Sequence, residues 1–307
     1  MSRAVTISIL TYKRHEHLRR ALESALRYAD QVAEIIVVDN AAEPELKSML
    51  ASDYPNVRYI AAPSNAGCEG RNIGLRAAST PIVITIDDDV ELSSSDCIAE
   101  VENAFSRDPR LACLNFTVTG VDGKVLERDW CHPRPISHAS REFETHFILE
   151  GASALNREKV LAVGGYPAEF FLGHEGGDLG YRLIGKGYRV VHTPRVSTTH
   201  YAAMEHRPDW RVYYYYTRNG IWVAYRSFPP LMATTRAIAY LVTMGAFSVR
   251  AMQVPAFLRG CVDGVRGLSR MDRHNLDADS LKHVREIRSE RVPLVGRIQR
   301  RLRERIL

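Results

Sequence analysis

Four short apolar runs in the first third of the chain predict the strands of a buried sheet. They lie at residues 5–10, 35–38, 57–60 and 82–86 and are rich in β-branched residues. Apolar runs of this length favour parallel strands that are covered on both faces of a sheet.

The segments between these runs carry helical patterns. One of them has the i, i+3, i+4, i+7, i+8 spacing of a single helix face, at Leu18, Ala21, Leu22, Ala25 and Leu26. Helical patterns also fit residues 43–50 and 69–78. The order is therefore βαβαβαβ, which predicts a doubly wound α/β fold.

Polar residues follow each predicted strand, and open α/β sheets bind their ligands at the carboxyl ends of the strands. The most informative group is Asp87, Asp88 and Asp89, which come directly after an apolar run. Three adjacent carboxylates repel one another, and Mg²⁺ or Mn²⁺, which prefer oxygen ligands, would make the arrangement favourable. A solvated acidic turn is the alternative.

Two common phosphate-binding signatures are absent from the sequence. Residues 11–14 contain no glycine, so the dinucleotide fingerprint fails after the first strand, and GxxxxGK[ST] does not occur. Nicotinamide-dependent and P-loop chemistry are therefore disfavoured, and a metal-bridged diphosphate remains the way to hold a nucleotide on this sheet.

A second cluster of ionisable residues lies in a glycine-rich stretch at residues 173–183. Glu175 and Asp178 could both point into a cleft, as a general base should. In the alternative interpretation, Asp178 caps the following helix and Glu175 is solvated. His200 ends a short strand and is either a structural histidine or a ligand.

The rest of the chain is described by coarser patterns. Residues 122–150 are irregular and predict a long excursion over the sheet, whereas the chain after residue 203 is helical with a break at residues 228–230. We therefore expect a sheet domain at 1–205, divided into halves at 1–120 and 121–205, and a helical region with a basic tail at 206–307.

Composition and charge refine this description. Of the 307 residues, 45% are hydrophobic and 25% are charged, which excludes a disordered or fibrous chain. The net charge of +5 is uneven, because residues 281–307 hold nine Lys and Arg against three acids, while the remainder carries 32 basic and 33 acidic residues. The basic character thus belongs to the tail.

The five cysteines are widely spaced and include no CxxC pair, which is typical of reduced thiols in a cytosolic protein. No signal peptide is visible. The uncharged stretch at residues 237–249 is too short to cross a bilayer, which takes about 20 residues. We expect a cytoplasmic protein that docks on the inner membrane face through a basic and apolar C-terminal region.

Taken in order, these motifs resemble the inverting family 2 glycosyltransferases with a GT-A fold. The resemblance implies a doubly wound mixed sheet, with a nucleotide-sugar-binding half at 1–120 and an acceptor and base half at 121–205 of a catalytic domain. Residues 8–14 look like the family's first strand and its T-Y-N-R turn, with Lys13 in place of Asn. Residues 37–41 match V-V-D-N-A/S, residues 65–74 match N-x-G-x-x-x-R-N-x-G, and residues 87–89 match the DxD metal motif.

The resemblance extends to residue 201 and includes the family's E-D-x-D-L-x-x-R-L box, to which residues 175–183 correspond. The sequence departs from the box at Gly176, where the second acid would stand, and this leaves the identity of the base open. The candidates are, in order, Glu175, Asp178 and His174. Related enzymes complete the metal site with a histidine after the following strand, a role that falls to His200.

The resemblance also implies a set of binding residues. Those for the nucleotide sugar are Thr11, Tyr12, Arg14, Asp39, Asn65, Arg71, Asp87 and Asp88. Those for the metal, Mn²⁺ or Mg²⁺, are Asp89, Asp87 and His200. The family's Asp at position 39 reads the nucleobase, which suits the pyrimidine of a UDP or dTDP sugar.

The implied activity is the transfer of one sugar to a hydroxyl acceptor on a glycan, glycolipid or natural product. The Q-x-x-R-W box of processive members is absent, so we expect a non-processive hexosyltransferase. We expect no nucleic-acid partner and leave a homo-oligomer open. The alternatives are a sugar nucleotidyltransferase, whose G-x-G-x-R signature is missing, and a non-enzymatic module that binds a membrane surface.

Overall fold

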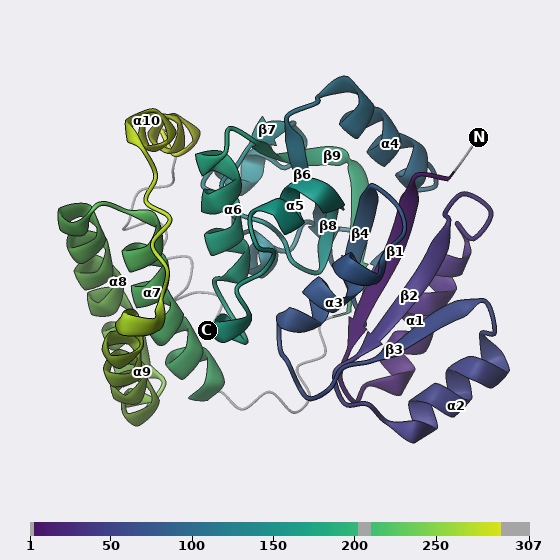
Figure 1. The fold of residues 1–307 in the computed structure, drawn as a ribbon, viewed down its shortest axis with the longest axis horizontal. Helices are drawn as coiled ribbons and strands as arrows, with labels where there is room; N and C mark the ends of the chain where they lie inside the picture. The colour runs from purple at the N-terminus through teal and green to yellow at the C-terminus, as the bar shows by residue number, and fades with distance from the viewer. Residues whose placement is uncertain (1–2, 202–209, 290–307) are drawn as a thin grey trace.

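A computed structural model describes residues 3–201 and 210–289 of the chain. The four predicted strands are confirmed as β1 (Val5–Thr11), β2 (Glu34–Asp39), β3 (Val57–Ala61) and β4 (Ile82–Asp87). The helices between them are α1 (His15–Leu26), α2 (Pro44–Asp53) and α3 (Glu69–Ala77). The N-terminal part therefore has the expected βαβαβαβ order (Figure 1).

The remaining strands make the sheet a mixed one. After β4 come β5 (Val90–Leu92), α4 (Cys97–Arg107), β6 (Leu111–Thr119), β7 (Phe143–Glu144), β8 (Ala152–Asn156), α5 (Arg157–Ala162), α6 (Glu175–Gly185) and β9 (Arg189–His200). The strand order is β3-β2-β1-β4-β8-β6-β9-β5, with β7 beside β9. Strands β1 to β4 pair in parallel, whereas β8 is antiparallel to both β4 and β6.

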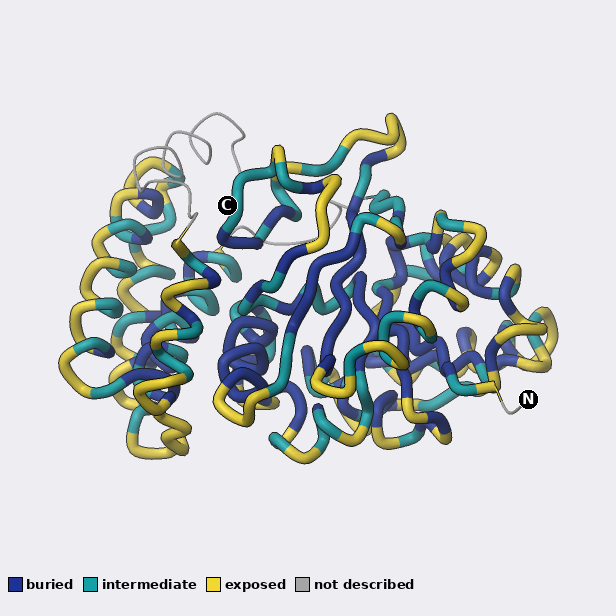
Figure 2. The backbone as a smooth tube through the Cα atoms, turned by 90° about the horizontal axis from the view of Figure 1, so that it is seen from above, coloured by how far each residue is buried: buried dark blue, intermediate teal, exposed yellow. Residues whose placement is uncertain are grey.

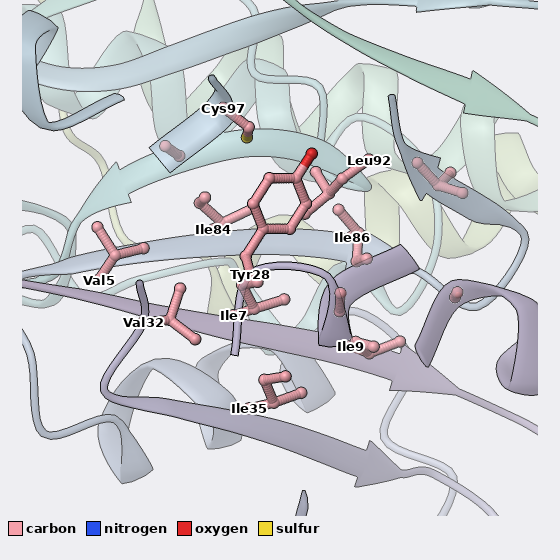
Figure 3. Close-up of a cluster of buried hydrophobic side chains, with 14 of the residues drawn as sticks. Val5, Ile7, Ile9, Tyr28, Val32, Ile35, Ile84, Ile86, Leu92 and Cys97 are labelled. Atoms are coloured by element: carbon pink, nitrogen blue, oxygen red, sulfur yellow. The ribbon is translucent and has the colours of Figure 1, made fainter. Parts of the chain in front are cut away.

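Two apolar layers cover the sheet. On one face, Ile7, Ile9, Ile35, Ile84 and Ile86 pack against apolar side chains of α1, α2 and α4, with Tyr28 and Cys97 among them (Figure 3). On the other face, side chains of β2 and β4 pack against α3, α5 and α6. Because adjacent residues of a strand point to opposite faces, both faces of the central strands are buried, as in a doubly wound sheet.

The C-terminal region is helical, as expected. It comprises α7 (Thr217–Ser227), α8 (Pro230–Arg250), α9 (Val254–Arg266) and α10 (Ala278–Ile287), and α7 packs against α6 of the sheet domain (Figure 1). The predicted break falls between α7 and α8, where Phe228 and Pro229 separate the two helices. Most of the basic tail, residues 290–307, lies outside the described residues.

Outward-facing parts of the C-terminal helices are exposed (Figure 2). Within residues 3–201 and 210–289, none of the helices combines the length and the apolar character that a membrane span requires. All five cysteines are free thiols, and three of them are buried.

Candidate active site

The candidate residues gather at the carboxyl edge of the sheet. Parallel pairing sets Thr11 of β1 beside Asp39 of β2 and Leu10 of β1 beside Asp87 of β4. His200, the last residue of β9, pairs with Val90 just after the acidic triplet. Strands far apart in the chain therefore deliver their terminal side chains to one edge, as the sequence predicted.

Asp39 is fully buried, and its carboxylate is held by three donors. Its Oδ1 accepts a hydrogen bond of 2.8 Å from the backbone nitrogen of Ala41, while Oδ2 accepts from the nitrogen of Glu43 at 2.8 Å and from the hydroxyl of Tyr59 at 3.0 Å. Burial of Tyr59 and its bond to Asp39 raise the pKa of the phenol to about 12. This carboxylate therefore has a fixed orientation at the end of β2.

Asp87 is paired with a cation that α3 supplies. The Nη2 atom of Arg71 lies 2.5 Å from Oδ1 of Asp87, and Nε of the same guanidinium donates to the carbonyl oxygen of Glu150 at 3.1 Å. The nearby carboxylates raise the pKa of Arg71 above its ordinary value although burial opposes this. Arg71 thus links α3, β4 and the segment before β8.

Asp88 and Asp89 are buried, so the solvated acidic turn is excluded. Arg14 bridges them, with Nη2 at 2.5 Å from Asp88 and Nη1 at 2.7 Å from Asp89. The hydroxyl of Thr11 also donates to Asp88 at 2.7 Å. Burial, with the neighbouring carboxylates, raises the pKa of Asp88 to about 7 even though Arg14 opposes the shift.

His200 lies between two carboxylates. Its Nε2 is 3.6 Å from Oδ1 of Asp89, and its Nδ1 is 2.7 Å from Oδ2 of Asp129. Burial alone would lower the pKa of His200, but the two carboxylates outweigh it and raise the pKa to about 9. Sequence reasoning missed Asp129, which lies in the irregular excursion in a short 3₁₀ turn, where no periodic pattern marks it.

The pair of Asp89 and His200 suits a divalent cation in the chemistry of its donors. Carboxylate oxygen and imidazole nitrogen are both ligands of Mn²⁺. Among the described residues, no three His, Cys, Asp or Glu side chains are grouped so as to hold a metal ion by themselves. The donor set therefore fits an ion that completes its coordination with phosphate oxygens and water, as Mg²⁺ commonly does.

Two of the residues predicted to bind the nucleotide sugar, Tyr12 and Asn65, are exposed. His174, a base candidate, faces the C-terminal helices. The imidazole Nε2 of His174 lies 2.7 Å from the hydroxyl of Tyr240 in α8. Of the three proposed base residues, His174 is thus engaged with the helical region instead of the acidic edge.

Asp178 is fully buried inside α6, and both of its oxygens face guanidinium groups. Nε of Arg182 lies 2.8 Å from Oδ2, and Nε of Arg226 in α7 lies 2.8 Å from Oδ1. The expectation that Asp178 caps the helix is wrong, because α6 begins at Glu175 and its N-cap position is His174. Asp178 joins α6 to α7.

Glu175 is also buried, with an exposed fraction of 5%, so its alternative interpretation as a solvated residue is wrong. Sequence reasoning missed the acid beside it, Glu150. The Oε1 atom of Glu150 accepts a 2.7 Å hydrogen bond from the backbone nitrogen of Gly176. Burial and the charge of Glu175 raise the pKa of Glu150 to about 8, and burial also raises the pKa of Glu175.

Comparison with known proteins supports the sequence resemblance. The profile described as "Glycosyl transferase family 2" matches residues 6–164. The succinoglycan biosynthesis protein ExoO of Rhizobium meliloti is 30% identical over 124 residues, which cover 40% of this chain and 36% of that protein. The N-acetylglucosaminyl-diphospho-decaprenol L-rhamnosyltransferase of Mycobacterium tuberculosis is 26% identical over 238 residues, covering 66% of this chain and 78% of that protein.

A solved structure shares the fold. The crystal structure of GalNAc-T7 with UDP, GalNAc and Mn²⁺ superposes with a TM-score of 0.61 at 14% identity, over 92% of this chain and 56% of that one. The expected GT-A type of mixed α/β fold, with additional C-terminal helices, is confirmed.

Proposed function

The chain belongs to glycosyl transferase family 2, and from that premise we propose that it is a metal-dependent inverting glycosyltransferase. It moves one sugar from a nucleoside diphosphate sugar to a hydroxyl group of a glycan, glycolipid or natural product. The observation that carries the proposal is the convergence of Asp39, Asp87 and the Asp89–His200 pair at one edge of the sheet. Family membership argues against the sugar nucleotidyltransferase.

The nucleotide would lie along the carboxyl ends of β1, β2 and β4. The fixed carboxylate of Asp39 would contact the base, and a UDP or dTDP sugar suits a pyrimidine there. Arg14 and Arg71 supply positive charge beside the position of the diphosphate. Thr11, Tyr12, Asn65, Asp87 and Asp88 would complete the contacts to the nucleotide sugar.

Asp89, Asp87 and His200 would hold Mn²⁺ or Mg²⁺. The ion, when bound, would act as a Lewis acid on the departing diphosphate. His200 is oriented for this role by Asp129, which occupies its other ring nitrogen at 2.7 Å.

The chain's own groups would carry out the rest of the reaction. The acceptor hydroxyl approaches the anomeric carbon from the face opposite the diphosphate, and a carboxylate takes its proton. Because one displacement occurs, the configuration inverts. The groups that can serve as this base are Glu175, the first residue of α6, and Glu150, which bonds the backbone nitrogen of Gly176. Asp178 cannot do so while both its oxygens hold guanidinium groups.

The C-terminal helices carry features that favour docking on a membrane surface. On α8 and α9, exposed apolar side chains recur at helical spacing, namely Leu231, Ile238, Val242 and Val249, and then Leu258, Val262 and Val265. An interfacial helix needs basic residues beside such an apolar face, and Arg250, Arg259 and Arg266 are exposed on these two helices. We propose that this face rests on the inner membrane surface beside a lipid-linked acceptor. Sedimentation with phosphatidylglycerol vesicles tests this docking. If Val242→Glu binds the vesicles as well as the wild type does, this face is not the docking surface.

A panel of nucleotide sugars, with and without Mn²⁺, tests the transferase function. We expect a UDP or dTDP sugar to raise the melting temperature only with the metal present. Asp89→Asn should abolish that dependence, while the exposed Asp96→Asn should leave it unchanged. No stabilisation and no turnover with any nucleotide sugar would refute the proposal.

A further inference from the structure

The segment at residues 146–150 runs unusually close to helix α6. A Cβ atom added to Gly176 would lie 2.1 Å from the carbonyl oxygen of Ile148, and one added to Gly180 would lie 2.2 Å from that of His146. The backbone nitrogen of Ile148 also donates to the carbonyl oxygen of Gly176 at 3.3 Å. The two glycines, four residues apart on one helix face, form the groove that admits this segment.

Glycine within a helix costs about 1 kcal/mol relative to alanine. The groove on α6 therefore has an energetic cost that close packing must offset. The close packing positions the next acidic side chain along the segment, that of Glu150.

The carboxylate of Glu150 fills the space in front of Gly176. Its Oε1 lies 2.7 Å from the backbone nitrogen of Gly176 and 2.5 Å from where a Cβ of residue 176 would be. A side chain at position 176 and the side chain of Glu150 would thus occupy the same volume. The acid that the family box carries at position 176 is absent, and an acid from another segment stands there.

Glu150 also adjoins the sugar-phosphate end of the proposed site. Its carbonyl oxygen accepts from Arg71, and Arg71 binds Asp87. A Cβ on Gly151, the next residue, would lie 2.5 Å from the carboxylate of Asp87. Glu150 is half-buried, whereas Glu175 is 5% exposed, so Glu150 is the more accessible residue of the two.

Resting on the transferase function proposed above, we propose that Glu150 is the catalytic base. The acceptor O–H bond breaks and its proton passes to the Glu150 carboxylate. The acceptor oxygen forms a bond to the anomeric carbon, and the bond from that carbon to the β-phosphate oxygen breaks. The electron pair of this bond leaves with the nucleoside diphosphate, and Glu150 then loses its proton to solvent.

The electrostatic surroundings of Glu150 suit a base that works near neutral pH. Burial and Glu175 raise the pKa of Glu150 to about 8, while Arg71 opposes them. The titratable and charged groups that face it are Glu175, Arg71, Tyr166, Cys68 and Cys113. Substituting Glu175 should therefore move the acid limb of the pH–rate profile to lower pH.

Four variants separate the roles, namely Glu150→Gln, Glu150→Asp, Glu142→Gln and Glu175→Gln. The readout is release of nucleoside diphosphate from the donor found in the panel. Glu150→Gln retains an oxygen for the Gly176 N–H, so the fold and donor binding should persist while kcat falls by about 10²–10⁴. The acid limb of the pH–rate profile should disappear in Glu150→Gln. Glu150→Asp should recover part of the rate, and Glu142→Gln, at an exposed acid just before this segment, should match the wild type.

The outcomes distinguish this inference from the transferase function. If the wild type is active and Glu150→Gln stays within fivefold with its acid limb in place, Glu150 is not the base. Loss of turnover in Glu175→Gln together with an active Glu150→Gln would transfer the role to Glu175. A wild type that binds and turns over no nucleotide sugar would overturn both the function and the inference.

Discussion

The ion-pair cluster around Asp178 makes a prediction that separates a structural carboxylate from a catalytic one. Asp178 is fully buried, and the two guanidiniums bonded to it, Arg182 and Arg226, are 6% and 7% exposed. Asp178→Asn removes the charge that compensates them. The amide also offers only one acceptor oxygen, so its NH₂ group must face one of the guanidiniums, where it has no favourable interaction.

Removing one partner of a buried ion pair costs about 3–5 kcal/mol, because the remaining charge is left uncompensated. Arg182 keeps a hydrogen bond of 2.6 Å to the carbonyl oxygen of Gly165, which places the expected loss toward the lower end of that range. For a chain of this size, we expect the melting temperature to fall by roughly 5–15 °C. Because Asp178 joins α6 to α7, the α7 contact should loosen first.

Thermal and urea unfolding followed by circular dichroism measure this loss. Asp279→Asn, at an exposed position in α10, is the control and should change the free energy of unfolding by less than about 0.5 kcal/mol. At temperatures where the variant is folded, Asp178→Asn should retain transfer. An unchanged melting temperature with lost transfer would refute the reasoning and restore Asp178 as the base.

Two further predictions concern stability. Gly180→Ala should destabilise the fold by about 1–3 kcal/mol, since its Cβ would lie 2.2 Å from the backbone oxygen of His146. In Gly177→Ala, the Cβ would lie 3.5 Å from the Phe147 ring, so the free energy of unfolding should instead rise by up to about 1 kcal/mol from helix propensity. Equal effects of the two variants in thermal unfolding would contradict the close packing at Gly180. Burial lowers the pKa of His192 to about 4. The unfolded chain therefore takes up this proton from about pH 6.5 downward while the fold resists it, so the free energy of unfolding should decrease from pH 6.5 to 4. His192→Asn should flatten that slope in urea titrations, and an unchanged slope would contradict the assignment.

Local sequence was sufficient for the fold of the first half of the chain. Strands β1 to β4 and helices α1 to α3 were predictable because short apolar runs and helical periodicity are properties of neighbouring residues. The convergence of the polar residues after each strand was predictable for a related reason. Parallel strands bring their carboxyl ends to the same edge whichever residues fill the connections.

The sequence could not predict which side chains complete that site. Asp129 meets His200 across 71 residues, Glu150 meets Gly176 across 26, and Arg226 meets Asp178 across 48. The first two acids stand in segments without periodicity, so only the folded chain shows their partners. Asp178 looked like a candidate base because it shares a motif with Glu175.

The sequence by itself thus determined an α/β sheet with acids at its carboxyl edge, and its motifs indicated the family. The tertiary structure decided the partners and the burial of each acid. Helix α6 turns Asp178 toward α7, and the glycines on another face of α6 let the segment before β8 bring Glu150 to position 176. Such assignments depend on close contacts between segments distant in the chain, and these contacts are fixed by packing instead of by local pattern.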